Sequence, residues 1–138
     1  MKKIKYFIPS IILMIIIFSF SNQTGSESSG LSQHIVLWIQ THLHITMSEF
    51  IIRKGAHMSE YALLCLTFIY AFSHYQFTIK QILFYSILCS FAYACTDEMH
   101  QLFIGGRAGQ FTDVLIDSSG ACLMSFVYYL INRIYAKR

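Results

Sequence analysis

The chain has 138 residues, of which 55% are hydrophobic and only 12% are charged. Its length favours a single domain, residues 1–138. Soluble domains usually carry about 25% charged residues, and a soluble domain this small could not bury so much apolar surface. Composition therefore argues against a soluble globular domain and favours a membrane protein.

Four apolar runs account for the composition. They cover about 4–21, 56–73, 81–104 and 112–132, and each approaches the ~20 residues that a helix needs to cross about 30 Å of hydrocarbon. The opening "MKKIK" resembles the basic start of a signal peptide, but "SNQTGSESSG" after the first run has no small-residue cleavage pattern. The sequence thus predicts an all-α membrane protein, a bundle of four transmembrane helices with the first one retained.

The basic residues predict the orientation of this bundle. Segments 1–5, 74–80 and 132–138 would lie on one side of the membrane, and they hold seven of the ten basic residues and no acid. The seven are Lys2, Lys3, Lys5, Lys80, Arg133, Lys137 and Arg138. Lys and Arg accumulate on the cytoplasmic side, so we expect both termini to be cytoplasmic. The net charge of +3 is then a topology signal, and we expect no nucleic-acid partner.

The first outer loop, residues 22–53, is the one long polar stretch. Its start, "SNQTGSESSGLS", is typical of an irregular segment or a helix cap. In the following "LSQHIVLWIQTHLHI", Leu31, Ile35, Trp38 and Ile39 recur at helical spacing. This pattern predicts a short amphipathic helix on the outer membrane surface.

The later connections are short. "SHYQFTIK" joins the second and third spans and "IGGRAGQF" joins the third and fourth, so each pair is expected to form a helical hairpin. Gly105 and Gly106 supply the turn, and Thr112 or Asp113 is a candidate cap for the fourth helix.

Ionisable groups open the second span, in "IIRKGAHMSEYALL". Lys54, His57 and Tyr61 lie along one helical face, and Glu60 follows His57 at i+3. At about 1.5 Å per residue, Glu60 lies only one to two turns below the outer boundary.

The third span ends in "TDEMHQ". Asp97, His100 and Gln101 share a face by their i+3 and i+4 spacing, whereas Glu98 is turned about 100° away from Asp97. All four side chains would therefore lie near the outer boundary, at the depth reached by Glu60.

The fourth span begins "FTDVLIDSSGA", which places Asp113 and Asp117 one turn apart, and Arg107 lies in the tight loop above. A charge at the bilayer centre costs at least ~2.5–3.5 kcal/mol, so three helices with acids at one depth suggest a shared cavity. Two structural alternatives remain. One is an ion-pair network that fixes the bundle, and the other is solvation at the interface, which suits Glu98 and Asp113 better than Asp117.

These residues resemble the VanZ-like family of small bacterial membrane proteins. The matching pieces are "FSFSNQTGSESSGLS", "RKGAHMSEYALL" and "TDEMHQLFIGGRAGQFTDVLIDSSGA", which together cover nearly the whole chain. The second piece contains the family's pattern as Arg53, Lys54, His57, Glu60 and Tyr61. The third piece departs from the family at residue 117, where Asp replaces the common Asn.

The resemblance implies a multi-pass protein of the bacterial cytoplasmic membrane. The founding member is associated with resistance to the glycopeptide teicoplanin, so we expect a role at the outer face in glycopeptide resistance or in modification of the cell envelope. Expected partners are membrane lipid and a lipid-linked cell-wall precursor or a glycopeptide, and the sequence does not give the oligomeric state.

Three mechanisms stay open. In an enzyme acting on a lipid-linked envelope substrate, the catalytic candidates are His57, Glu60, Asp97, Glu98 and His100, as acid–base groups or as ligands of a divalent cation such as Mg²⁺. The spacing selects no metal. In a binding module the same cluster would hold a head group, with Lys54, Tyr61, Gln101, Arg107, Asp113 and Asp117 as binding candidates and with Lys54 and Arg107 on a phosphate. The third mechanism is a structural or transport-type protein.

Overall fold

The structure is a computed structural model, and it describes residues 3–107 and 109–135. Over these residues it contains helices and no strand, which confirms the expected all-α class. The elements are a 3₁₀ turn η1 (Ile4–Phe7) and the helices α1 (Ile8–Ser21), α2 (Gly25–Leu43), α3 (Glu49–Ser73), α4 (Ile79–Gln101) and α5 (Phe111–Tyr135).

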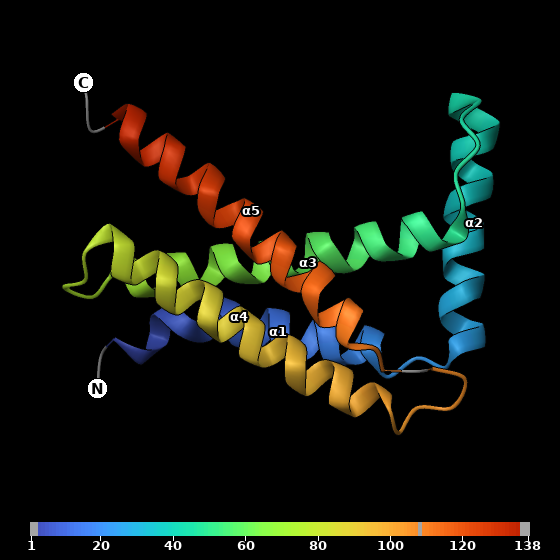
Figure 1. Cartoon of the computed structure of the whole chain (residues 1–138), viewed down its shortest axis with the longest axis horizontal. Helices are drawn as coiled ribbons and strands as arrows, with labels where there is room; N and C mark the ends of the chain where they lie inside the picture. Colours follow the sequence, from blue (N-terminus) through green and yellow to red (C-terminus); the bar gives the residue numbers. More distant parts are fainter. Residues whose placement is uncertain (1–2, 108, 136–138) are drawn as a thin grey trace.

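Four of the helices form an elongated bundle (Figure 1). α1 and α4 run in one direction along it, and α3 and α5 run in the other. α2 stands across one end, where α1 and α4 finish and α3 and α5 begin. We call this the α2 end of the bundle.

Three of the expected spans are long and apolar enough to cross a membrane: Ile4–Ser21, Ile79–Gln101 and Phe111–Tyr135. α3 is not among them, because its first half carries several polar and ionisable groups. α3 nevertheless packs against α1, α2, α4 and α5, so much of its surface meets protein instead of lipid. The four-crossing topology stays a prediction, and of the basic residues on which its orientation rests, Lys2, Lys137 and Arg138 lie outside the described residues.

The core forms where α3 meets its neighbours. Tyr61, Leu64 and Phe68 of α3 pack with Ile17 of α1 and Val114 of α5. In contrast, large apolar side chains on the outward faces of α1 and α5 are exposed, among them Ile12, Ile15, Phe126 and Ile134. Such exposure suits a helix bundle that is surrounded by lipid.

Side-chain caps set where three of the helices begin. The Thr24 hydroxyl accepts from the Glu27 amide and the Glu27 carboxylate accepts from the Thr24 amide, which is a capping box for α2. Ser48 caps α3, and Thr78 with Gln81 forms a second capping box at α4. Of the two expectations for "SNQTGSESSGLS", the helix cap is confirmed, because Thr24 caps α2, and the irregular segment is wrong beyond residue 24, because α2 starts at Gly25.

Several expected boundaries differ from the structure. α3 begins at Glu49, although the second span was expected to begin at about residue 56 and the outer loop to extend to residue 53. α4 ends at Gln101, three residues before the expected end of the third span, and residues 102–107 form a series of turns. α5 begins at Phe111, so Thr112 and Asp113 lie inside its first turn and neither precedes the helix as a cap. The Asp113 carboxylate instead pairs with the Lys54 ammonium of α3, and that contact fixes α5 against α3.

Candidate functional site

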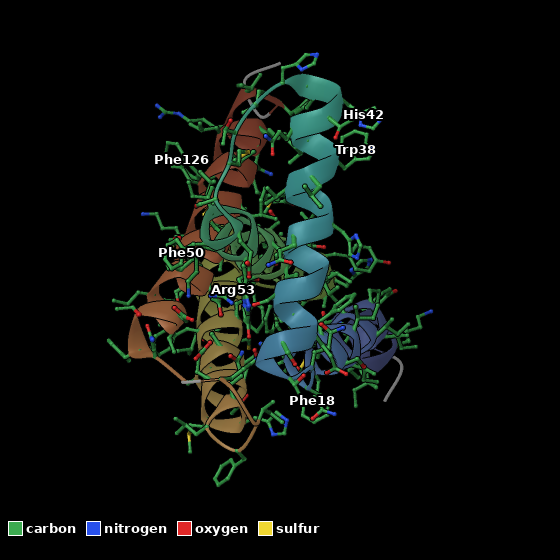
Figure 2. The ribbon with its side chains drawn as sticks, turned by 90° about the vertical axis from the view of Figure 1, so that its right-hand side faces the viewer. Phe18, Trp38, His42, Phe50, Arg53 and Phe126 are labelled. Carbon is green, nitrogen blue, oxygen red and sulfur yellow. The ribbon has the colours of Figure 1, made fainter. Side chains whose placement is uncertain are left out.

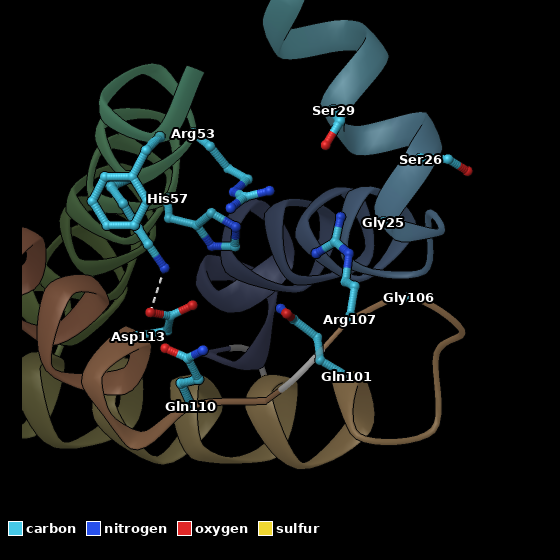
Figure 3. A pocket seen from close by; sticks show the side chains of 12 residues that line it. Gly25, Ser26, Ser29, Arg53, His57, Gln101, Gly106, Arg107, Gln110 and Asp113 are labelled. Carbon is cyan, nitrogen blue, oxygen red and sulfur yellow. Dashed lines mark hydrogen bonds and ion pairs between the residues drawn. The ribbon is translucent and has the colours of Figure 1, made fainter. Parts of the chain in front are cut away.

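The α2 end contains a cavity of about 340 Å³ (Figure 3). It lies between the first turns of α2, the start of α3 and the connection from α4 to α5. Its lining residues are Gly25, Ser26, Ser29, Phe50, Arg53, Lys54, His57, Gln101, Gly106, Arg107, Gln110 and Asp113. Residues of α3, α4 and α5 meet at this cavity and α2 adds a fourth wall, but of the five acids expected to converge on it only Asp113 is among its described lining residues.

The lining of this larger cavity carries more positive than negative charge. Arg53 and Arg107 point into it from opposite sides (Figure 3). Asp113 is the carboxylate among the described lining residues, and it is already paired with Lys54. Arg107 donates a long hydrogen bond of 3.4 Å to the Phe20 carbonyl, and within the described residues neither arginine forms an ion pair with Asp or Glu. Burial lowers the pKa of Arg107 from its ordinary value, but a guanidinium remains protonated at neutral pH.

A second cavity of about 130 Å³ lies beside the first. Arg53, His57 and Arg107 line both cavities, and Glu60 and Asp97 line only the smaller one. Its other lining residues are Ile17, Phe20, Ser21, Gln23, Ser28, Leu31, Ser32, Ile35, Ile52 and Ala56. The smaller cavity thus has one polar wall, shared in part with the larger cavity, and one apolar wall built by α1, α2 and α3.

Three of the predicted acids are buried, Asp97 in the wall of the smaller cavity and Glu98 and Asp117 behind the cavities. The exposed fractions of Asp97, Glu98 and Asp117 are 3%, 5% and 0%. Gln101 donates to one Asp97 oxygen at 3.3 Å, and the amide of Gln110 donates to one Glu98 oxygen at 3.0 Å. Interfacial solvation is therefore the wrong description of Glu98, because the chain after α4 folds back over its carboxylate.

Several buried oxygens have no hydrogen-bond partner within the described residues. Among the acids they are Oδ1 of Asp97, Oε1 of Glu98 and both carboxylate oxygens of Asp117, and the hydroxyl oxygens of Ser10, Ser21 and Tyr61 are the others. Nδ1 of His57 lies 3.6 Å from Asp117 Oδ1, which is close enough for an ion pair when His57 is protonated but too long for a hydrogen bond. Buried polar atoms are normally paired, so these acids are poised to take up protons, water or a polar ligand.

Besides Glu98 and Asp117, two further predicted residues line neither cavity. His100 Nε2 is 3.3 Å from the Asn22 side-chain oxygen, and its ring packs against Phe18 at 4.7 Å between centroids. Tyr61 is fully buried in the core, and its ring centroid is 6.2 Å from that of Tyr93. His100 therefore joins α4 to α1, and Tyr61 belongs to the packing that supports the site.

The sequence left open whether the cluster holds a divalent cation. In residues 3–107 and 109–135, no group of three or more His, Cys, Asp or Glu residues is arranged to hold a metal ion. The acids of α3, α4 and α5 reach the same depth but face different neighbours.

Some lining residues were not predicted as site residues. Arg53 was noted as part of a motif but not proposed for the site, although its spacing of four residues from His57 places both on one face of α3. The sequence did not indicate that Ser26 and Ser29 of α2 line the cavity, because only the position of α2 across the bundle brings them there.

A glycine contact joins α2 to the rest of the site. The Gly25 amide donates to the Gly105 carbonyl at 3.2 Å, and Gly106 has a positive φ of 77°. A Cβ added at Gly25 would lie 2.2 Å from the Gly106 carbonyl oxygen, so this close approach requires glycine. The contact holds the first turn of α2 over the α4–α5 connection.

Comparison with known proteins adds to this geometry. A family model described as VanZ/LLP1 matches residues 6–132. Curated proteins and solved structures give no significant match. The family match covers every residue of both cavities and all but the outermost residues of the three apolar helices. The chain therefore belongs to the VanZ/LLP1 family and is a VanZ-like membrane protein.

Proposed function

We propose that residues 1–138 form one domain that crosses the bacterial cytoplasmic membrane four times, with both termini in the cytoplasm. Its α2 end lies at the outer face and binds the phosphate-bearing head group of an envelope lipid or a lipid-linked cell-wall precursor. The observation that carries the proposal is the pair of arginines, Arg53 and Arg107, which face each other across the larger cavity without an acidic partner among the described residues.

The chemistry of the lining favours a phosphate. A guanidinium offers several N–H donors in a planar fork that matches phosphate oxygens. Lys54 adds positive charge, although Asp113 neutralises much of it. Ser29 of α2 supplies a hydroxyl group on the opposite wall, whereas the Ser26 hydroxyl points away from the cavity and lies 3.1 Å from the Thr24 hydroxyl (Figure 3). This set can surround an anion with donors from three separate elements.

The proposed depth suits a head group better than a free metabolite. Arg53, Lys54 and His57 lie in the first turns of α3, close to the proposed outer boundary of the bilayer. A ligand anchored in the outer leaflet would present its phosphate at that level. Binding of such a precursor by the cavity would change the access of a glycopeptide antibiotic to its target. This would link the cavity to teicoplanin.

Binding of inorganic pyrophosphate by the purified full chain in lipid nanodiscs tests the anion site. Charge-assisted hydrogen bonds are worth roughly 1.5–3 kcal/mol each. Arg53→Gln or Arg107→Gln should therefore weaken binding by about tenfold or more. Arg133→Gln, near the opposite end of α5, is the matched charge control and should bind like wild type. Equal affinity in all four proteins would refute the anion site.

The envelope role needs a separate test in cells. A teicoplanin-sensitive bacterium would express wild type, Arg107→Gln or Arg133→Gln at equal membrane levels. We expect protection by wild type and Arg133→Gln and its loss in Arg107→Gln. Sensitivity of cells that express wild type would reject the antibiotic role, whatever the pyrophosphate titration gives.

Catalysis is the second candidate, and one observation favours it. His57 lines both cavities and lies 3.6 Å from the buried Asp117, so an imidazole stands beside the proposed phosphate with a carboxyl group behind it. Release of phosphate from farnesyl diphosphate by the purified chain would test this. Loss of an acid–base group usually lowers a rate by a factor of 10²–10⁴. The His57→Gln variant should therefore release phosphate more slowly than wild type by that factor, while its pyrophosphate binding persists. No turnover by wild type would reject hydrolysis of this substrate class.

A further inference from the structure

We infer that the ligand of the larger cavity carries a long alkyl or prenyl chain, and that the smaller cavity is the subsite for the beginning of that chain. The inference rests on the proposed function for the phosphate end of the ligand. It adds a second site, which holds the start of the lipid chain, and so says where each end of the proposed lipid phosphate lies.

The first support is that the two cavities share a wall. Arg53, His57 and Arg107 line both. A phosphate held by the guanidinium groups in the larger cavity would therefore have its ester oxygen next to the entrance of the smaller one. Figure 2 looks at the α2 end, where Arg53 lies beside α2 near the middle of the view.

The second support is the composition of the apolar wall. Ile17 and Phe20 come from α1, Leu31 and Ile35 from α2, and Ile52 from α3. An apolar wall directly beside two unpaired arginines is what an amphiphile requires, because its two ends bury against different surfaces. A soluble phosphate ester would leave this wall without a partner.

The third support is an exit toward lipid. Ile17, at the inner end of the apolar wall, is 1% exposed, whereas Phe20, Leu31 and Ile35 are 45%, 53% and 41% exposed. The wall therefore runs from the protein interior to an open side between α1 and α2. A cavity of about 130 Å³ holds only the first part of a long chain, and the rest would continue through this opening into the bilayer.

The acids on the polar wall fix the direction of the ligand. Glu60 and Asp97 line the smaller cavity and are absent from the described lining of the larger one. A phosphate in the smaller cavity would be repelled by nearby carboxylates, so the phosphate occupies the larger cavity and the chain occupies the smaller. The stems of Arg53 and Arg107 can cover the start of the chain while their charged ends face the phosphate.

Photo-crosslinking in lipid nanodiscs tests this placement with the full chain. The probe is a hexadecyl phosphate with a diazirine close to the phosphate, and the specific signal is the labelling that unlabelled hexadecyl phosphate removes. We expect this signal on the peptides that contain Phe20, Leu31 and Ile35. Hexadecanol at the same concentration should not remove it, and Arg107→Gln should reduce it by about tenfold, as expected for a lost charge-assisted contact.

A pair of variants on α2 separates the chain subsite from general contact with lipid. Ile35→Trp adds volume at the apolar wall, and Leu37→Trp makes the same change two residues away, at a side chain that is 59% exposed and lines neither cavity. Ile35→Trp should lower specific labelling by at least fivefold while pyrophosphate binding stays unchanged. Leu37→Trp should label like wild type, which also controls for effects of tryptophan on α2.

The outcomes separate the two proposals. Pyrophosphate binding that depends on Arg107, together with labelling spread equally over the lipid faces of α4 and α5, would overturn the chain subsite and keep the anion site. Removal of labelling by hexadecanol as effectively as by hexadecyl phosphate would also overturn it. If wild type neither binds pyrophosphate nor shows specific labelling, both proposals are overturned.

Discussion

Lys54 and the two arginines differ in how their charge is balanced. Lys54 pairs with Asp113, and both side chains are 16% exposed. Arg53 and Arg107 have no carboxylate partner within the described residues. Of the three cations, Lys54 therefore acts mainly as a link between α3 and α5, and the arginines supply the charge that is available to a ligand.

A double-mutant cycle on Lys54 and Asp113 tests this assignment. Lys54→Gln and Asp113→Asn should each lower stability, because each leaves a half-buried charge without its partner. The double variant should lose less stability than the two single variants lose together, and the difference, which is the coupling energy, should be roughly 0.5–3 kcal/mol. Thermal unfolding in detergent would measure it, and strictly additive losses would contradict a direct pair.

At this scale the sequence predicted which groups gather but not their partners. Helical spacing placed Lys54, His57 and Glu60 near one another on α3. It could not show that His100 turns to Asn22 and Phe18 of α1, because that depends on how α1 packs against α4. Arg53 was missed although its spacing from His57 places both on one face of α3, and only the packing of α2 shows that this face lines a cavity.

At the scale of helices, one close crossing determines how α3 packs against α5. A Cβ added at Gly120 of α5 would lie 2.0 Å from the Met58 carbonyl oxygen of α3, so the two backbones touch at this point. Met58 is one residue from His57 and Gly120 is three residues from Asp117. The crossing therefore sets the distance between these two site residues.

Gly120→Ala should consequently destabilise the protein, because the helices must separate to admit the methyl group. Gly55→Ala in α3 is the matched control, because a Cβ there meets nothing within 4 Å, and replacing a mid-helix glycine by alanine usually stabilises by roughly 0.5–1 kcal/mol. Melting temperatures in detergent should therefore shift in opposite directions. A Gly120→Ala protein as stable as wild type would show that the crossing is loose.

The start of α2 has a pH-sensitive cap. The backbone amide of Thr24, together with its hydroxyl, donates to the Glu27 carboxylate and holds the pKa of Glu27 below its ordinary value of 4.5. A lowered native pKa means that the cap stabilises α2 above the ordinary value and is lost as the pH falls through the native one.

Hydrogen exchange should therefore show faster opening of the first turn of α2 at pH 3 than at pH 6, after correction for intrinsic rates. The capping box of α4 is the internal control, because Thr78 pairs with Gln81 and neither side chain titrates in this range. Glu27→Gln should remove the difference between the two pH values. If the opening of the first turns of α2 and α4 changed equally between the two pH values, the role of Glu27 would be contradicted.

At the scale of the whole molecule, the open question is the number of crossings. α3 is less apolar than the other three long helices, yet it is the helix that packs against all of its neighbours. A helix shielded by others tolerates polar groups within the bilayer when they face protein or a cavity. This is the physical argument for a fourth crossing.

Cysteine labelling tests that topology in a variant without the four native cysteines. Gln40→Cys on α2 should react with a membrane-impermeant maleimide in intact cells. Gln76→Cys, in the exposed turn between α3 and α4, should react only after the cells are opened. Reaction of both from outside would mean that α3 does not cross and would require a different orientation.

The sequence by itself determined the helical class, the apolar helices and the end of the bundle where charge accumulates. These follow from composition and from the spacing of residues within single helices, which are local properties of the chain. Only the tertiary structure decided that α2 lies across the bundle, that Glu98 is buried and that Arg53 faces Arg107. Those features depend on how helices far apart in sequence rotate and pack against one another, and close backbone contacts such as Gly25 with Gly106 and Gly120 with Met58 fix that packing.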